Sequence, residues 1–176
     1  PSAMAARIPE YRDQGFRQFQ VKVGEDPATD IIRIHREAQK MEAGEVLNAD
    51  ANTGWKQHEA LQVADAIADL GKQTGIRLTF EQPCLSYHEC LAVRKHTDLP
   101  FVLDECMDSI GALLQGHHDH AMDMINLKIS RFGGLTRARQ ARDLCVSLGL
   151  PMNVEDSWGG EITTAAIAHL AHSTPS

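Results

Sequence analysis

Short apolar runs alternate with amphipathic segments along the whole 176-residue chain. Each apolar run has the length and composition of a β-strand, and each intervening segment spaces its apolar residues three and four apart, as helices do. Strands that alternate with helices predict a parallel sheet with right-handed crossovers, and therefore a fold of the α/β class. The six predicted strands lie at residues 16–23, 45–50, 76–83, 99–105, 122–129 and 150–156.

Two closures of such a sheet are possible, an open doubly wound sheet or a TIM-type (β/α) barrel. An open sheet gathers its ligands at one switch point, whereas in a barrel every strand ends at the same mouth. Polar residues follow nearly every predicted strand here, which favours the barrel. A full barrel has eight units and this chain has about six. We therefore expect residues 1–176 to form a single domain that is part of a larger barrel.

Five charged residues recur at the ends of consecutive predicted strands. The steps are 28 residues from Lys22 to Asp50, then 31 to Glu81, 23 to Asp104 and 24 to Lys128. Residues with that period at strand ends converge on one face of a parallel barrel. The spacing therefore predicts one site that contains three carboxylates and two lysines.

These residue types suit a metal-assisted proton transfer. Mg²⁺ prefers oxygen ligands, and Asp50, Glu81 and Asp104 would supply three. Lysine becomes a useful base when a nearby cation lowers its pKa, so Lys22 and Lys128 could exchange protons with a bound substrate. The metal would hold a substrate carboxylate and stabilise the enediolate. Each carboxylate alone could equally be a helix cap, but three in register favour the metal site.

Composition and charge restrict the partners and the location. A net charge of −7 argues against nucleic acid, because phosphate binding needs a basic surface. No apolar stretch approaches the roughly 18 residues of a membrane span, so no membrane partner is expected. The four cysteines lack the spacing of a zinc site, and we expect reduced thiols in a cytoplasmic protein. A homo-oligomer that binds a small-molecule carboxylate is the expected state.

Five segments resemble the enolase superfamily, within the muconate-lactonizing-enzyme-like subgroup of the mandelate racemase/muconate lactonizing enzyme family. They are GFRQFQVKVG, NADANTGW, FEQP, LDE and NLKISRFGG. The resemblance implies a modified (β/α)₇β barrel preceded by a capping domain, which we expect to be absent from this chain. It also implies that Asp50, Glu81 and Asp104 bind Mg²⁺, and that Lys22 and Lys128 are the acid/base pair.

Some residues depart from this resemblance or add to it. The subgroup usually has a lysine two residues before the first catalytic lysine, and here Gln20 stands there. Gln20 can still donate a hydrogen bond there, and by the resemblance Asn52 of the DAN segment is expected near the metal, so both are expected to contact the substrate. Glu155, Asp156 and Trp158 follow the last predicted strand, where two carboxylates and an indole suit a substrate ammonium group. An acidic first helical turn with a packed tryptophan is the alternative.

The resulting functional hypothesis is abstraction of the α-proton of a carboxylate substrate. A racemase, an epimerase or a dehydratase of an amino-acid derivative would use all of these residues, and the possible ammonium site slightly favours substrates of the proline and hydroxyproline type. A muconate-type cycloisomerase and a sugar-acid dehydratase are alternatives from the same superfamily. A catalytically silent barrel fragment with a structural or assembly role is the alternative of a different class.

Overall fold

The computed structural model describes residues 2–175 and divides into two compact units. The first unit extends to Phe101 and the second begins at Val102. Strand β4 (Phe101–Leu103) starts at the last residue of the first unit and continues into the second. The prediction of one domain for residues 1–176 stays a prediction.

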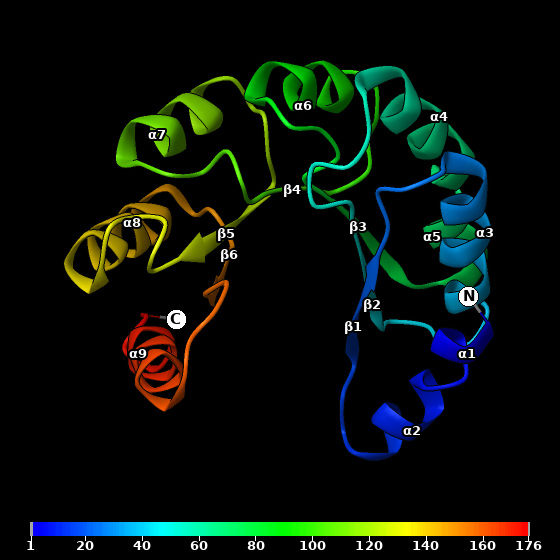
Figure 1. Ribbon diagram of the computed structural model, residues 1–176, viewed down its shortest axis with the longest axis horizontal. Helices are drawn as coiled ribbons and strands as arrows, with labels where there is room; N and C mark the ends of the chain where they lie inside the picture. The colour runs from blue at the N-terminus through cyan, green and yellow to red at the C-terminus, as the bar shows by residue number, and fades with distance from the viewer. Residues whose placement is uncertain (1, 176) are drawn as a thin grey trace. The chain divides into compact units, whose positions relative to one another are not determined.

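The first unit is a parallel sheet covered by helices. Its strands β1 (Gln18–Lys22), β2 (Val46–Asp50) and β3 (Arg77–Glu81) pair in chain order. The helices lie on one side of these strands (Figure 1). The helices are α1 (Ser2–Ala5), α2 (Ile8–Asp13), α3 (Pro27–Ala38), α4 (Gln57–Ile67), α5 (Leu70–Thr74) and α6 (Tyr87–Arg94).

Alternation along the strands decides which side chains meet the helices. Successive side chains of a strand point to opposite faces, so Val21, Leu47 and Phe80 pack in the core and are fully buried. On the covering helices, Val63 and Ile67 of α4 are also fully buried. The polar residues of each strand are thereby left on the opposite face, and the last residue of each strand belongs to this polar set.

The second unit repeats the arrangement. Its strands β5 (Met124–Lys128) and β6 (Met152–Glu155) are parallel, and β4 pairs with β5. Its helices are α7 (Ile110–His118), α8 (Leu135–Leu148) and α9 (Glu161–His172). In Figure 1, α8 and α9 follow β5 and β6 as the chain turns from yellow to red. The core contains Leu127, Ala141 and Cys145, all fully buried.

All six strands predicted from the sequence are present, each within or overlapping its predicted range. One prediction was less accurate, because residues 57–74 form two helices, α4 and α5, where one amphipathic segment was expected. The four cysteines are free thiols, as expected. Across residues 2–175, no helix has the length and apolar character needed to cross a membrane.

Candidate active site

The polar end of the first unit brings three of the predicted residues into one row. Lys22, Asp50 and Glu81 are the last residues of β1, β2 and β3, and they are cross-strand partners in the parallel register. Parallel strands end at one edge of the sheet, so this register places the three side chains side by side. Asp50 and Glu81 are each only 1% exposed.

Lys22 is bonded to both Asp50 and Asn52. Its Nζ donates to Asp50 Oδ2 and, at 2.9 Å, to Asn52 Oδ1. Asp50 also accepts from Gln20 Nε2 at 3.0 Å and, through Oδ1, from the Asn52 backbone N–H at 2.9 Å. The side chain of Lys22 is 58% exposed, so its ammonium is open to solvent although its carboxylate partner is buried. The structure thus brings Gln20 and Asn52 into contact with two of the predicted site residues, Asp50 and Lys22.

The loops that follow β2 and β3 contain residues with unusual backbone conformations. Asn52, Thr53 and Gln82 have positive φ angles of 44°, 69° and 33°. Such angles cost free energy for residues other than glycine, above all for a β-branched residue such as Thr53. The Thr53 N–H donates to Gln82 O at 3.0 Å, which ties the two loops together. Asn52 and Thr53 follow Asp50 by two and three residues, and Gln82 directly follows Glu81.

The second unit holds the other lysine and the third carboxylate. Lys128, the last residue of β5, donates from Nζ to Asp104 Oδ2 at 2.6 Å and lies 3.6 Å from Glu155 Oε1. Arg131 donates to the other oxygen of Asp104. Asp104 is fully buried and Lys128 is 9% exposed. Burial lowers the pKa of the Lys128 ammonium, but the hydrogen bond to Asp104 and the charges of Asp104 and Glu155 outweigh it, so the pKa lies above its ordinary value.

The three residues predicted at the end of β6 and just after it lie in different surroundings. Asp156 accepts two hydrogen bonds from Ser130, one from the backbone N–H at 2.9 Å and one from the hydroxyl. These bonds hold the loop after β5 in place. Burial raises the pKa of Asp156, but hydrogen bonds from Ser130 and Ser157 outweigh burial and keep the pKa below its ordinary value. The Trp158 side chain is 92% exposed and is not packed against a core. Glu155 lies beside Lys128.

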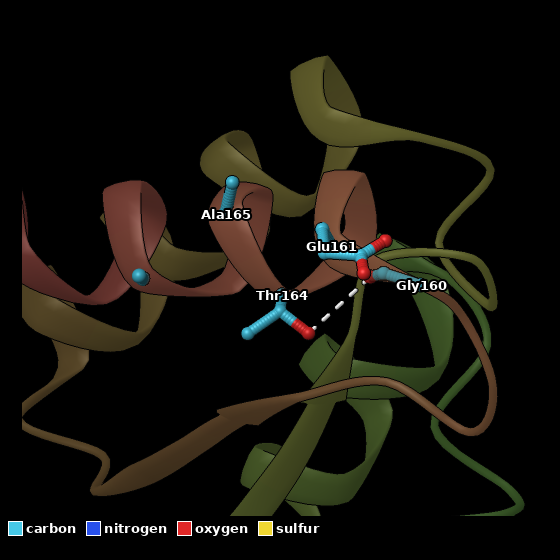
Figure 2. Close-up of a pocket in the computed structure, with 5 residues that line it drawn as sticks. Gly160, Glu161, Thr164 and Ala165 are labelled. Atoms are coloured by element: carbon cyan, nitrogen blue, oxygen red, sulfur yellow. Dashed lines mark hydrogen bonds between the residues drawn. The ribbon is translucent and has the colours of Figure 1, made fainter.

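A hollow of about 530 Å³ lies over the start of α9, after this segment (Figure 2). Small side chains line it, with Thr164 bonded through Oγ1 to the Gly160 carbonyl at 3.3 Å. Glu161 is its one ionisable lining residue. None of the residues predicted from the sequence lines it, and it has no arrangement of acid and base groups.

The donor chemistry of the carboxylates fits Mg²⁺. Within residues 2–175, no three His, Cys, Asp or Glu side chains are gathered closely enough to hold a metal ion. Instead, cationic nitrogens of Lys22, Lys128 and Arg131 contact oxygens of Asp50 and Asp104. A buried carboxylate needs a positive partner, and here the ammonium and guanidinium groups supply it. Mg²⁺ prefers oxygen ligands, and these carboxylate oxygens are bound to positively charged groups in the structure.

Comparison with known proteins assigns the chain to a family. The family model described as Enolase C-terminal domain-like matches residues 3–176. This chain belongs to that family. The match extends through both units, and it confirms the sequence prediction of an enolase-superfamily barrel portion.

The relatives of this Enolase C-terminal domain-like chain are enzymes. It is 51% identical, over all of its 176 residues, to cis-3-hydroxy-L-proline dehydratase of Roseibium aggregatum, and covers 46% of that protein. It is 32% identical to L-Ala-D/L-Glu epimerase of Bacillus subtilis, where 98% of the chain covers 47% of the relative. The chain thus spans about half the length of these curated relatives.

Solved structures give the same assignment. A mandelate racemase/muconate lactonizing enzyme from Roseovarius nubinhibens matches with a TM-score of 0.91 and 42% identity, over 98% of this chain and 46% of that one. An enolase-superfamily member from the same organism, complexed with magnesium, matches with a TM-score of 0.86 and 35% identity, over 98% and 45%. The predicted TIM-type barrel class is thereby confirmed.

Sequence reasoning missed two residues of the candidate site. Asn48 donates to Glu81 Oε2, and Thr79 Oγ1 donates to Asn48 Oδ1 at 2.8 Å. Both lie two residues before a strand-end carboxylate, and side chains two apart share a face of a strand. That spacing was the available signal. The identity of each partner depends on strand register, which the sequence pattern does not give.

Proposed function

We propose that the protein containing this chain is a Mg²⁺-dependent dehydratase of a cyclic hydroxylated amino acid, of the 3-hydroxyproline type. The observation that carries the proposal is that two strand-end lysines, Lys22 and Lys128, each bond a buried carboxylate in their own unit. The 51% identity to a cis-3-hydroxy-L-proline dehydratase supports dehydration among the reactions that a lysine pair can perform.

In this proposal Asp50, Glu81 and Asp104 bind the metal. Mg²⁺, when bound, would hold the substrate carboxylate and stabilise the negative charge that develops as the α-proton leaves. Each proposed acid/base group lies beside a proposed metal ligand, because Lys22 bonds Asp50 and Lys128 bonds Asp104. The proposal that both lysines act on one substrate rests on these two pairs and on the family.

The reaction needs one base and one acid. One lysine, as the free amine, takes the proton from C2 of the substrate, and the C–H electrons form the C2–C3 double bond. The C3–O bond breaks, and the hydroxyl leaves as water with a proton from the other lysine. In a cis-3-hydroxy acid the C2 hydrogen and the C3 hydroxyl lie on opposite faces of the ring. Two lysines on opposite sides of the substrate would suit this geometry.

We further propose that Glu155 receives the ring nitrogen, which is a cation in proline-type substrates. The Glu155 side chain is 40% exposed and lies near Lys128. Asp156 would position the loop through Ser130, and the exposed Trp158 would supply an aromatic face for the ring. Gln20 and Asn52 would steady Lys22 and Asp50. The free thiols fit a cytoplasmic enzyme.

A racemase or epimerase of an amino-acid derivative is the second candidate. The 32% identity to a dipeptide epimerase favours it, and the same two lysines would serve, one removing the α-proton and the other returning it. The two candidates differ in whether the substrate carries a leaving group at C3. Cycloisomerisation and sugar-acid dehydration would use the same residues but act on other substrates.

The test uses the longest form of the protein that the producing cell makes, in D₂O with Mg²⁺. Proton NMR follows the α-proton of cis-3-hydroxy-L-proline, its trans isomer, L-proline and N-substituted amino acids. Muconate and a sugar acid complete the panel. We expect loss of water from cis-3-hydroxy-L-proline, and a loss of at least about 10²-fold in rate in Lys22→Ala and in Lys128→Ala, as for removal of a general acid or base.

Each alternative has its own outcome. Exchange or inversion at the α-carbon without loss of water would replace the dehydratase with a racemase or epimerase. Turnover of muconate or of the sugar acid would select the corresponding superfamily reaction. A folded protein that binds Mg²⁺ but exchanges no α-proton in any substrate would leave the silent barrel fragment as the function.

A further inference from the structure

A second row of polar side chains lies directly below the strand-end residues of the first unit. Gln20, Asn48 and Thr79 are cross-strand partners in the parallel register. Each stands two residues before the last residue of its strand, so each points to the same face as that last residue. These three side chains are therefore placed to contact the side chains at the strand ends, from the side nearer the start of each strand.

The contacts of this row run diagonally from one strand to the next. Gln20 on β1 donates from Nε2 to Asp50 Oδ2 on β2, at 3.0 Å. Asn48 on β2 donates from Nδ2 to Glu81 Oε2 on β3. Each amide thus supports the carboxylate at the end of the following strand, with the same offset in register. A repeated offset indicates a shared role for the two amides.

Thr79 and Glu81 bond the two ends of the Asn48 amide. The Thr79 hydroxyl donates to Asn48 Oδ1 at 2.8 Å, and the Asn48 NH₂ donates to Glu81 Oε2. The reversed amide would direct a carbonyl oxygen at a carboxylate oxygen, and two acceptors repel each other. Glu81 is 1% exposed, so little solvent is available to replace a lost donor.

We propose that Asn48 is a positioning residue for Glu81, held in turn by its hydrogen bond with Thr79. This inference rests on the proposed function in one respect, that Glu81 is a ligand of the divalent metal. Hydrogen bonds to ligand carboxylates fix their rotamers, and loss of such support weakens metal affinity about 10–100-fold. Asn48 thus acts on the metal through Glu81, without contact to the substrate.

The experiment measures Mn²⁺ affinity by the electron paramagnetic resonance signal of free Mn²⁺, on the longest form of the protein. The variants are Asn48→Leu, which removes the donor at similar volume, and Thr79→Val, which removes the hydroxyl alone. The matched control is Asn153→Leu, because Asn153 occupies the corresponding place on β6 but donates to Asn126, an amide, at 2.9 Å. Circular dichroism checks that each variant folds.

We expect the Mn²⁺ dissociation constant to rise about 10-fold or more in Asn48→Leu, about 3-fold in Thr79→Val and less than 2-fold in the control. If Asn48→Leu does not fold, the Thr79→Val result decides. An unchanged affinity in folded Asn48→Leu and Thr79→Val overturns the inference, as does a wild-type protein that binds no Mn²⁺. Failure of the proposed function is separate: a wild type that binds Mn²⁺ but transforms no substrate leaves the Asn48 result interpretable.

Discussion

Two loops beside the candidate site approach each other at glycine. Gly24, after β1, has φ +103°, and a Cβ at this position would stand 2.2 Å from the Ala51 carbonyl oxygen. Gly54 faces it from the other loop, where a Cβ would lie 2.1 Å from Gly24 O. The atoms in the way are backbone atoms, which cannot move aside as a flexible side chain can. These glycines therefore allow the chain to close tightly around Asp50.

Gly24→Ala should destabilise the protein more than backbone conformation alone can explain. We expect a loss of about 3 kcal/mol, the sum of a positive-φ cost and a steric clash. Gly44→Ala is the matched control, because Gly44 also has a positive φ, +88°, but no atom lies within 4 Å of the added Cβ. Its expected loss is about 1 kcal/mol. Urea unfolding measures both, and equal losses would contradict the predicted clash.

At the scale of elements, helix α3 places the carboxyl group of Glu37 in a largely apolar environment. Glu37 is 4% exposed, and its Oε1 has no hydrogen-bond partner. It lines a cavity of about 400 Å³ together with Ile8, Tyr11 and Phe19. Burial raises the pKa of Glu37 to about 7, against a lowering by Arg33. The helix therefore carries a group that favours its neutral form.

This pKa predicts how stability depends on pH. The unfolded chain releases the Glu37 proton near pH 4.5, while the folded chain keeps it to about pH 7. Stability should therefore fall as the pH rises from 4.5 to 7, by about 2–3 kcal/mol for this group. Glu37→Gln should remove that part of the pH dependence. Urea unfolding at pH 5 and pH 8 tests this.

The control for Glu37 is Glu25→Gln, whose side chain is 79% exposed. It should leave the difference in unfolding free energy between pH 5 and pH 8 unchanged. A Glu37→Gln variant with the wild-type difference would show that Glu37 keeps an ordinary pKa in the folded state.

At the scale of the whole molecule, individual helices differ in how many residues they bury. Helix α4 buries four apolar residues, Ala60, Val63, Ala64 and Ile67. Helix α9, described over its full length, buries Leu170 alone, and its Ile162 is 89% exposed. Few buried contacts allow a segment to open at low free energy. By this measure α9 is anchored to its unit more weakly than α4 is to its own.

Hydrogen exchange followed by mass spectrometry tests this on the 176-residue chain. Peptides from α9 should exchange at least about 10-fold faster than peptides from α4, because fewer buried contacts oppose opening. Helix α8, which buries four residues, is the internal comparison within the second unit and should be slower than α9. Equal protection of α8 and α9 would show that burial does not govern opening in this unit.

The sequence by itself determined the six strands and the charged residue at the end of five of them, because side-chain periodicity and strand ends are local properties. Lys22, Asp50 and Glu81 follow from that pattern, and the strand register places them in one row. Their grouping with Asp104 and Lys128 into one metal and acid/base site stays a prediction. Recognition of the family motifs added the barrel type, which the comparisons confirm.

Only the tertiary structure decided which side chains support these residues. The bond from Asn48 to Glu81 joins positions 33 residues apart in the chain, and that from Ser130 to Asp156 joins positions 26 apart. Such partners depend on strand register and on loop paths, which composition and periodicity do not encode. The same holds for the contact of Gly24 with Ala51, since a steric requirement for glycine arises only when two distant backbones meet.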